Sequence, residues 1–172
     1  MTVEEFNENL ASLKKGSKRA WREIYDEYYA FIYFTALSRA KNKAIAEDIA
    51  SDVMIALSLP SVGRQYVKNP KTFLYAMTLN KIKNTSRLKS TKDAELSYDV
   101  VDVKSNFAHS SVEISDLLLA LPPTERKIFV AHVFWGIPFN NIAKENGVSS
   151  TMVRRKYLKA CEFLKEQLKD EF

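Results

Sequence analysis

Apolar residues recur at spacings of three and four along most of the chain, the spacing that places them on one face of an α-helix. The clearest example predicts a helix from about Lys18 to Ala40, with Ser17 as a plausible N-cap. A shorter helix that ends near Gly16 is expected before it. The apolar face of the long helix consists of Trp21, Ile24, Tyr25, Tyr28 and Ile32, and that of the short one of Phe6, Leu10 and Leu13.

A helix over residues 43–59 is predicted to carry apolar side chains on two faces. The inner face consists of Ile45, Ile49, Val53, Ala56 and Leu57, and the outer face of Glu47, Asp48, Ser51, Met54 and Ile55. Acids beside exposed apolar side chains suit a protein partner better than water. A second buried contact within the same domain is an equally ordinary explanation for Met54 and Ile55.

A helix from Pro70 to about Leu88 follows a break at Pro60 and Gly63, with Asn69 as its cap. Its inner side is predicted to hold Leu74, Tyr75, Leu79 and Ile82, and its outer side Phe73, Met77, Asn80, Lys83, Asn84 and Arg87. An aromatic, amides and cations together are typical of surfaces that bind single-stranded nucleic acid. For Phe73 and Met77 alone, completing the core is the better interpretation.

The periodicity disappears between Ser90 and Ser111, where short polar residues dominate. Residues 91–111 are therefore predicted to be a flexible linker, which would span about 25 Å when relaxed and roughly 75 Å when stretched. It separates two helical units, residues 1–90 (the first unit) and 112–172 (the second unit). We expect their mutual placement to depend on something outside the chain.

The second unit has the pattern of a helix-turn-helix. Helices are predicted at about 113–121 and 124–135, then a short helix with Phe139, Ile142 and Ala143 inside. Gly147 supplies a turn that requires positive φ, with Val148 packed under it. The last helix has an inner stripe of Val153, Tyr157, Ala160, Cys161 and Leu164.

The outer face of this last helix is cationic, with Ser149 or Ser150 as the cap. In a helix-turn-helix the start of the second helix contacts base edges, and longer basic side chains neutralise phosphates. Thr151 and Arg155 are the best candidates for base contacts. The predicted DNA-binding residues are Ser150, Thr151, Met152, Arg154, Arg155, Lys156 and Lys159. The alternative, a solvated surface helix, has to account for four cations within six residues directly after the turn.

Composition agrees with an all-α protein, because 172 residues contain only four glycines and five prolines and 46% are hydrophobic. The net charge is +5, and no acid occurs between Val53 and Lys92. A stretch that has cations and no acids favours the binding of polyanions. On charge alone, a chance run of cations on a solvated helix is an equally good explanation. Its eight cations are Arg64, Lys68, Lys71, Lys81, Lys83, Arg87, Lys89 and Lys92.

Several classes of protein are not favoured. Cys161 is the only cysteine and no secretion signal is present, so disulfides are not expected and the cytoplasm is the default location. The sequence contains no run of about 18 apolar residues, so no membrane span is predicted. His109 and His132 lack ligand spacing, and no glycine-rich phosphate loop occurs, so we expect no metal, no cofactor and no enzymatic activity.

The order of these features resembles that of bacterial sigma factors of the extracytoplasmic-function group in the sigma-70 family, which have only the second and fourth sigma regions. The first unit carries "AEDIASDV" and "FLYAMTLNKIKN…R", and the second carries "LPPTERKIFVAHVFWGIPFNNIAKENGVSSTMVRRKYLKA". The resemblance covers about residues 12–168. Two motifs in this order, with a linker between them, are more specific than either alone.

The resemblance implies a transcription initiation factor whose partners are promoter DNA and core RNA polymerase, through the β′ clamp helices and the β flap. An anti-sigma factor is also implied, and membrane insertion is not. The polymerase-binding residues would be Glu47, Asp48, Ser51, Asp52, Met54 and Ile55. The minus-10 element would be bound by the loop 61–71 and by Arg64, Lys68, Lys71, Phe73, Met77, Asn80, Lys81, Lys83, Asn84 and Arg87, and the minus-35 element by the helix after Gly147.

The residues by themselves also allow two other functions. A stand-alone helix-turn-helix regulator would bind an operator duplex without polymerase, for instance as a dimer. A pure interaction module would dock on proteins only, and its binding would not respond to charge reversal within the basic helix.

Overall fold

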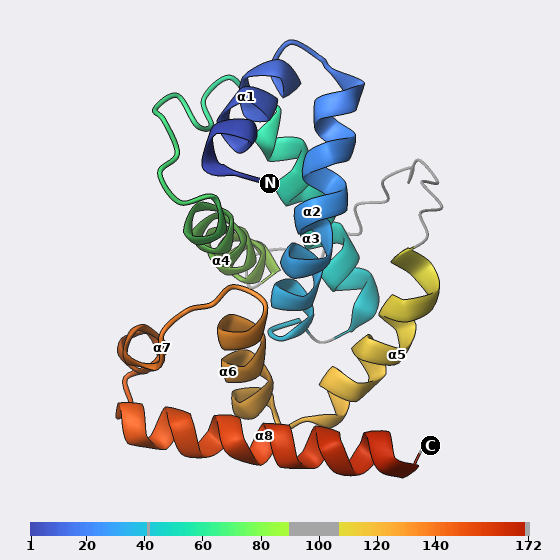
Figure 1. The fold of residues 1–172 in the computed structure, drawn as a ribbon, viewed down its shortest axis with the longest axis vertical. Helices are drawn as coiled ribbons and strands as arrows, with labels where there is room; N and C mark the ends of the chain where they lie inside the picture. The colour runs from blue at the N-terminus through green and yellow to red at the C-terminus, as the bar shows by residue number, and fades with distance from the viewer. Residues whose placement is uncertain (41, 90–106, 171–172) are drawn as a thin grey trace.

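The computed structural model describes residues 1–40, 42–89 and 107–170. These described residues form eight α-helices and no strand, which confirms the all-α class (Figure 1). The helices are α1 (Val3–Leu13), α2 (Lys18–Leu37), α3 (Lys43–Leu57), α4 (Pro70–Lys89), α5 (Phe107–Ala120), α6 (Pro123–Val133), α7 (Phe139–Asn146) and α8 (Ser150–Asp170). Within the described ranges, none of these helices is long and apolar enough to cross a membrane.

The first unit packs α1, α3 and α4 around α2 (Figure 1). The expected cap of α2 is confirmed, because the Ser17 side chain accepts a hydrogen bond from the Ala20 amide, but the helix ends at Leu37 rather than Ala40. Phe6, Ile24 and Ile32 are fully buried between these helices. Complete burial of such side chains is worth about 1.5–3 kcal/mol each, so their shared core holds the four helices together.

The two faces of α3 differ from the prediction at one residue. Met54 is only 2% exposed and belongs to the core, whereas Ile55 is 62% exposed. Met54 follows Val53 and lies one turn after Ala50, and both of these are buried, so the buried stripe is wider than the predicted one. Met54 is therefore not a surface residue, and its assignment to a partner interface was wrong.

Helix α4 begins at Pro70 as predicted, and the Asn69 side chain accepts from the Thr72 amide at 3.0 Å. Leu74 and Tyr75 are buried. Phe73 is half-buried, with its ring centroid 6.4 Å from that of Phe6. This confirms that Phe73 helps complete the core.

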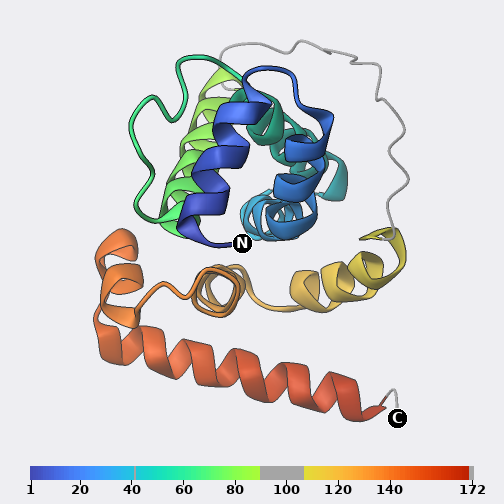
Figure 2. The ribbon, with the colours of Figure 1, turned by 45° about the horizontal axis from the view of Figure 1, so that its top comes forward.

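In the second unit, α6 and α7 lie on α8 (Figure 2). Gly147 adopts φ 64°, the left-handed conformation predicted at this turn. Ser149 is the N-cap of α8, because its hydroxyl accepts from the Met152 amide at 3.2 Å. Val148 is 37% exposed and does not pack under the turn as expected.

Helix α5 begins at Phe107, six residues before the predicted start at Glu113. It therefore includes residues 107–111, which the sequence pattern assigns to the linker. The expectation of a flexible linker over residues 91–106 lies outside the described residues.

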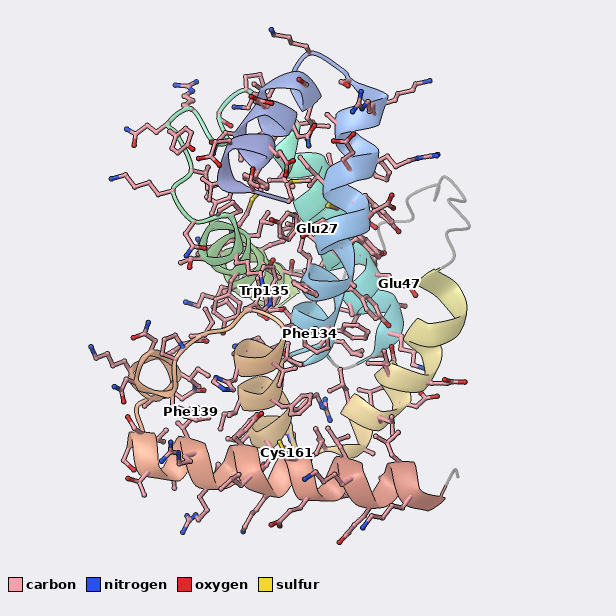
Figure 3. The ribbon with its side chains drawn as sticks, in the orientation of Figure 1. Glu27, Glu47, Phe134, Trp135, Phe139 and Cys161 are labelled. Carbon is pink, nitrogen blue, oxygen red and sulfur yellow. The ribbon has the colours of Figure 1, made fainter. Side chains whose placement is uncertain are left out.

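The two units contact each other, contrary to the expectation that their placement depends on something outside the chain. Phe134 and Trp135, just beyond the end of α6, face α2 and α4 (Figure 3). Trp135 is 3% exposed and donates its indole N–H to the Thr35 hydroxyl at 2.6 Å. Aromatic residues at a contact between units have the same sequence pattern as those in the core of one unit, so the contact was not predictable.

Candidate nucleic-acid and protein interfaces

The outer face of α8 forms a continuous exposed surface with a cationic start. Thr151, Arg154, Arg155 and Lys159 are all exposed, as predicted. Leu158, which was not among the predicted residues, is 53% exposed between them. It lies three residues after Arg155 and four after Arg154, so the same helical spacing identifies it.

Three of the residues predicted to contact DNA at the start of α8 also contact other parts of the chain or are half-buried. The Arg154 guanidinium lies 5.9 Å from the centroid of the Phe139 ring, although its side chain stays exposed. Ser150 and Met152 are half-buried, and the Ser150 hydroxyl is hydrogen-bonded to the Asn140 side chain. The protein contacts of Ser150 reduce its availability for DNA.

Lys156 contacts α6 instead of solvent. Its ammonium lies 2.9 Å from the Glu125 carboxylate, and the two side chains are 26% and 13% exposed. Burial by itself raises the pKa of Glu125, but the hydrogen bond from Lys156, a backbone hydrogen bond and the charges of Lys156 and Lys159 together outweigh it and leave that pKa below its ordinary value. In this structure the charge of Lys156 is used to hold α8 on α6.

Replacing Lys156 by Ala is expected to lower the free energy of unfolding by about 0.5–1 kcal/mol and to weaken promoter binding less than Lys159→Ala does. The pKa of Glu125 is lower in the folded state than in the unfolded state. The ion pair therefore contributes to the free energy of unfolding above the pKa of the unfolded carboxyl group, and this contribution is lost as pH falls through the pKa of the folded state. Urea unfolding of the parent chain and of Lys156→Ala, at neutral pH and in acid, measures the difference in stability between them. An equal stability difference at both pH values would contradict the prediction.

A loop with exposed cations precedes α4 in the first unit. The Asn7 side chain accepts from the Val67 amide at 2.8 Å and donates to the Val67 carbonyl at 3.0 Å, so the loop is tied to α1. Gly63 adopts φ 57°, and a Cβ there would meet Leu10. A shallow groove along this loop is lined by Gly63, Arg64, Gln65, Tyr66, Val67, Lys68, Asn69, Thr72 and Phe73.

Within that groove, Arg64 and Lys68 are exposed as predicted, and Tyr66 is 58% exposed. The loop 61–71 was predicted to bind the minus-10 element, but Tyr66 was not singled out within it. An exposed aromatic between two cations is suited to stacking on a base, so Tyr66 joins the candidate residues.

The outer face of α4 continues this cationic surface. Asn80, Lys83 and Asn84 are exposed, as predicted. Lys71 is exposed near the start of the helix, and its ammonium lies 5.6 Å from the centroid of the Phe31 ring. The side chain of Arg87 lies outside the described residues.

Two candidates on α4 have other roles in this structure. Met77 is half-buried and packs against the core, in line with the core interpretation of this residue. The Lys81 ammonium lies 2.8 Å from the Asp52 carboxylate of α3, with both side chains partly exposed. This ion pair joins a residue predicted to bind DNA to one predicted to bind polymerase.

The candidate protein-binding face lies on α3. Glu47, Asp48, Ser51, Asp52 and Ile55 are exposed. Leu59, one turn beyond Ile55, is 47% exposed. Acids around exposed aliphatic side chains fit a partner with cations and an apolar patch.

A ladder of stacked aromatic rings runs along α2. The ring centroids are separated by 4.7 Å between Trp21 and Tyr25, 4.3 Å between Tyr25 and Tyr29, and 6.5 Å between Tyr29 and Tyr33. Burial, and to a lesser degree Tyr25, raises the pKa of Tyr29, while a hydrogen bond with Ser51 opposes the shift. The ladder thus reaches the candidate protein-binding face at Ser51. Its spacing of four was visible in the sequence, but only Trp21 and Tyr25 were predicted to lie on the apolar face, and Tyr29 and Tyr33 were not named.

The sequence matches two family models. Residues 24–91 match sigma-70 region 2, and residues 111–164 match sigma-70, region 4. Together the two matches cover more than half of the chain, in the order that the motifs predicted. Among curated proteins, none matches the sequence.

A search of solved structures found a similar fold in the structure of CnrH in complex with the cytosolic domain of CnrY, with a TM-score of 0.53 and 16% sequence identity. The similarity covers 98% of this chain and 99% of that one, so it includes both units. The helix-turn-helix, the cationic α4 surface and the two matched regions agree with one another. The chain therefore belongs to the sigma-70 family, as an extracytoplasmic-function sigma factor that directs RNA polymerase to promoters.

Proposed function

We propose that the two cationic surfaces bind two different elements of one promoter. The second unit would bind the minus-35 element as duplex DNA, and the first unit would bind and help to open the minus-10 element. The observation that carries this proposal is that each unit has its own cationic surface, on α8 and on α4 with the preceding loop, and most of these cations are exposed.

At the minus-35 element, the start of α8 would enter the major groove. Thr151 and Arg155 are exposed one turn apart, so both side chains can reach base edges from the same face. Arg154 and Lys159 lie beside them and would neutralise phosphates. A bidentate arginine–guanine contact is worth about 1–3 kcal/mol of discrimination between bases, which makes Arg155 the main candidate for specificity.

At the minus-10 element, strand opening requires unpaired bases to be held. Tyr66 offers a stacking surface, Asn80 and Asn84 offer hydrogen bonds, and Arg64 and Lys68 offer charge for the backbone. Each base stacked on an aromatic ring contributes about 1–3 kcal/mol. Holding bases in this way requires no catalysis by this chain, since the polymerase forms the phosphodiester bonds.

For the polymerase, we propose that Glu47, Asp48, Ser51, Asp52 and Ile55 on α3 bind the β′ clamp helices. The second unit would contact the β flap, and the complex would act in the cytoplasm. CnrH is described in complex with the cytosolic domain of CnrY. By analogy, a regulatory domain that competes with polymerase for this chain is a candidate partner.

We expect specific promoter binding to depend on core polymerase. Run-off transcription over a genomic promoter library, with purified core and the full chain, measures this directly. Weak binding by the chain alone and promoter-specific transcripts after addition of core are the expected result. A duplex shifted by the chain alone, as tightly as by the complex, would favour the stand-alone regulator.

A further inference from the structure

One side of α1 holds the loop that precedes α4 (Figure 1). Asn7 reaches the main chain of Val67, and the Lys14 ammonium donates to the Gly63 carbonyl at 3.1 Å. Leu10 lies where a Cβ on Gly63 would be, so only glycine lets the loop come this close. Asn7, Leu10 and Lys14 follow one another at spacings of three and four, which places them on the same side of the helix.

The Asn7 amide makes a two-point contact with Val67. Its oxygen accepts from the Val67 amide at 2.8 Å, and its nitrogen donates to the Val67 carbonyl at 3.0 Å. The same nitrogen also donates to the Val3 carbonyl at 2.8 Å, within α1. One hydrogen bond fixes a distance, whereas two bonds to the same residue also fix its orientation. Asn7 therefore holds Val67 at a set distance from α1 and in a set orientation.

Fixing Val67 determines where its two neighbours point. The Val67 side chain is 7% exposed and belongs to the core, whereas Tyr66 is 58% exposed and Lys68 is exposed as well. Because rigid peptide units join each residue to the next, a rotation of Val67 about the chain would move both of these side chains. Tyr66 and Lys68 are the groups proposed above to stack on an unpaired base and to bind the DNA backbone.

Tyr66 also contacts α1 directly. Desolvation, followed by the negative charge of Glu4 and a hydrogen bond with it, raises the pKa of Tyr66. The hydroxyl therefore keeps its proton at neutral pH and donates to the Glu4 carboxylate. Helix α1 thus contacts the loop at residues 63, 66 and 67.

We propose that Asn7 is a positioning residue for recognition of the minus-10 element, because it holds the loop in the shape in which Tyr66 and Lys68 meet the unpaired strand. The proposal rests on the function proposed above for this loop. Asn7 acts through the loop and not on DNA, since both polar atoms of its amide are bonded within the chain. A loop that is already in place loses less conformational entropy when the strand binds, and this favours opening.

The test compares Asn7→Ala with Asn9→Ala in the full-length chain. Asn9 lies on the same helix, and its side chain donates to Glu23 of α2 at 2.9 Å. Each substitution therefore removes side-chain hydrogen bonds of α1, but only Asn7→Ala releases the loop. Without polymerase, trypsin should cleave after the exposed Arg64 and Lys68 about fivefold faster or more in Asn7→Ala, and at the parent rate in Asn9→Ala.

With core polymerase, permanganate oxidation of unpaired thymines measures opening of the minus-10 element. At a promoter found by run-off transcription, we expect Asn7→Ala to lower opening about tenfold. Its preference for that promoter over one with a substituted minus-10 element should fall as well. Core affinity and binding of a minus-35 duplex should stay at the parent values. A general loss of stability would lower all of these quantities together, so a loss confined to the minus-10 element identifies positioning.

A second pair of variants applies if Asn7→Ala folds poorly. Lys14→Met removes the anchor at Gly63 and should lower opening about threefold or more, whereas Lys15→Met, at the exposed neighbouring position, should not. The inference is wrong if Asn7→Ala and Lys14→Met open the minus-10 element as their controls do while Tyr66→Ala opens it less. If Tyr66→Ala also opens it at the parent level, the proposed function of the loop is overturned instead.

Discussion

Replacement of Arg155 by Glu is expected to abolish initiation at a minus-35-dependent promoter while binding of core polymerase persists. Arg155 is exposed on the outer face of α8, one turn from Thr151. The substitution removes a base contact worth about 1–3 kcal/mol and adds repulsion from the phosphates. Since each 1.4 kcal/mol is about a factor of ten, promoter-specific transcription should fall about 100-fold or more.

The matched control for this variant is Lys165→Glu. Lys165 is an exposed cation of the same helix, ten residues or about 15 Å further along. Run-off transcription and a core-binding assay on both variants separate loss of DNA contact from loss of net charge. Normal transcription by Arg155→Glu, or an equal loss in Lys165→Glu, would contradict the assignment of α8 to the minus-35 element.

The helix-turn-helix was predictable because its signals are local. Gly147 marks a turn that needs positive φ, Ser149 follows as a cap, and the inner stripe from Val153 onwards has helical spacing. The same holds for the start of α4 at Asn69 and Pro70. Caps, turns and periodicity depend on residues within a few positions, so one sequence is enough to locate them.

The roles of individual cations were less predictable, because they depend on partners far along the chain. Lys156 and Lys81 have the exposed positions of DNA contacts on a helical wheel, yet they pair with Glu125 and Asp52 respectively. No periodic pattern indicates which helix will face which. The burial of Met54 has a similar cause, since the width of a buried stripe is set by the neighbouring helices.

The contact between the units was missed for a further reason. A non-periodic segment between two helical patterns predicts separate bodies, and nothing in either pattern indicates whether they pack together. Trp135 and Phe134 fit the core of the second unit as well as an interface. Only the positions of Phe31, Phe34 and Tyr75 in space distinguish the two possibilities.

Ile55 should be the most sensitive apolar residue for polymerase binding. At 62% exposure it is the most exposed of the large apolar side chains that the structure describes, and Asp48, Ser51 and Asp52 lie on the same face of α3. We expect Ile55→Lys to weaken core binding about 10- to 100-fold, as loss of a central apolar anchor does at protein interfaces. A cation in the last turn of α3 suits the helix dipole, so the free energy of unfolding should change by less than about 0.5 kcal/mol.

Leu168→Lys is the matched control, because Leu168 is 43% exposed on α8 and far along the chain from α3. Competition of each variant with labelled parent chain for core polymerase gives the ratio of dissociation constants, and urea unfolding checks stability. Promoter contacts on α8 are intact in Ile55→Lys, so its transcription should recover when the variant is supplied in large excess over core. Dissociation constants within twofold of each other for the two variants would remove α3 from the polymerase interface, because an exposed aliphatic group among acids would then have no role in binding.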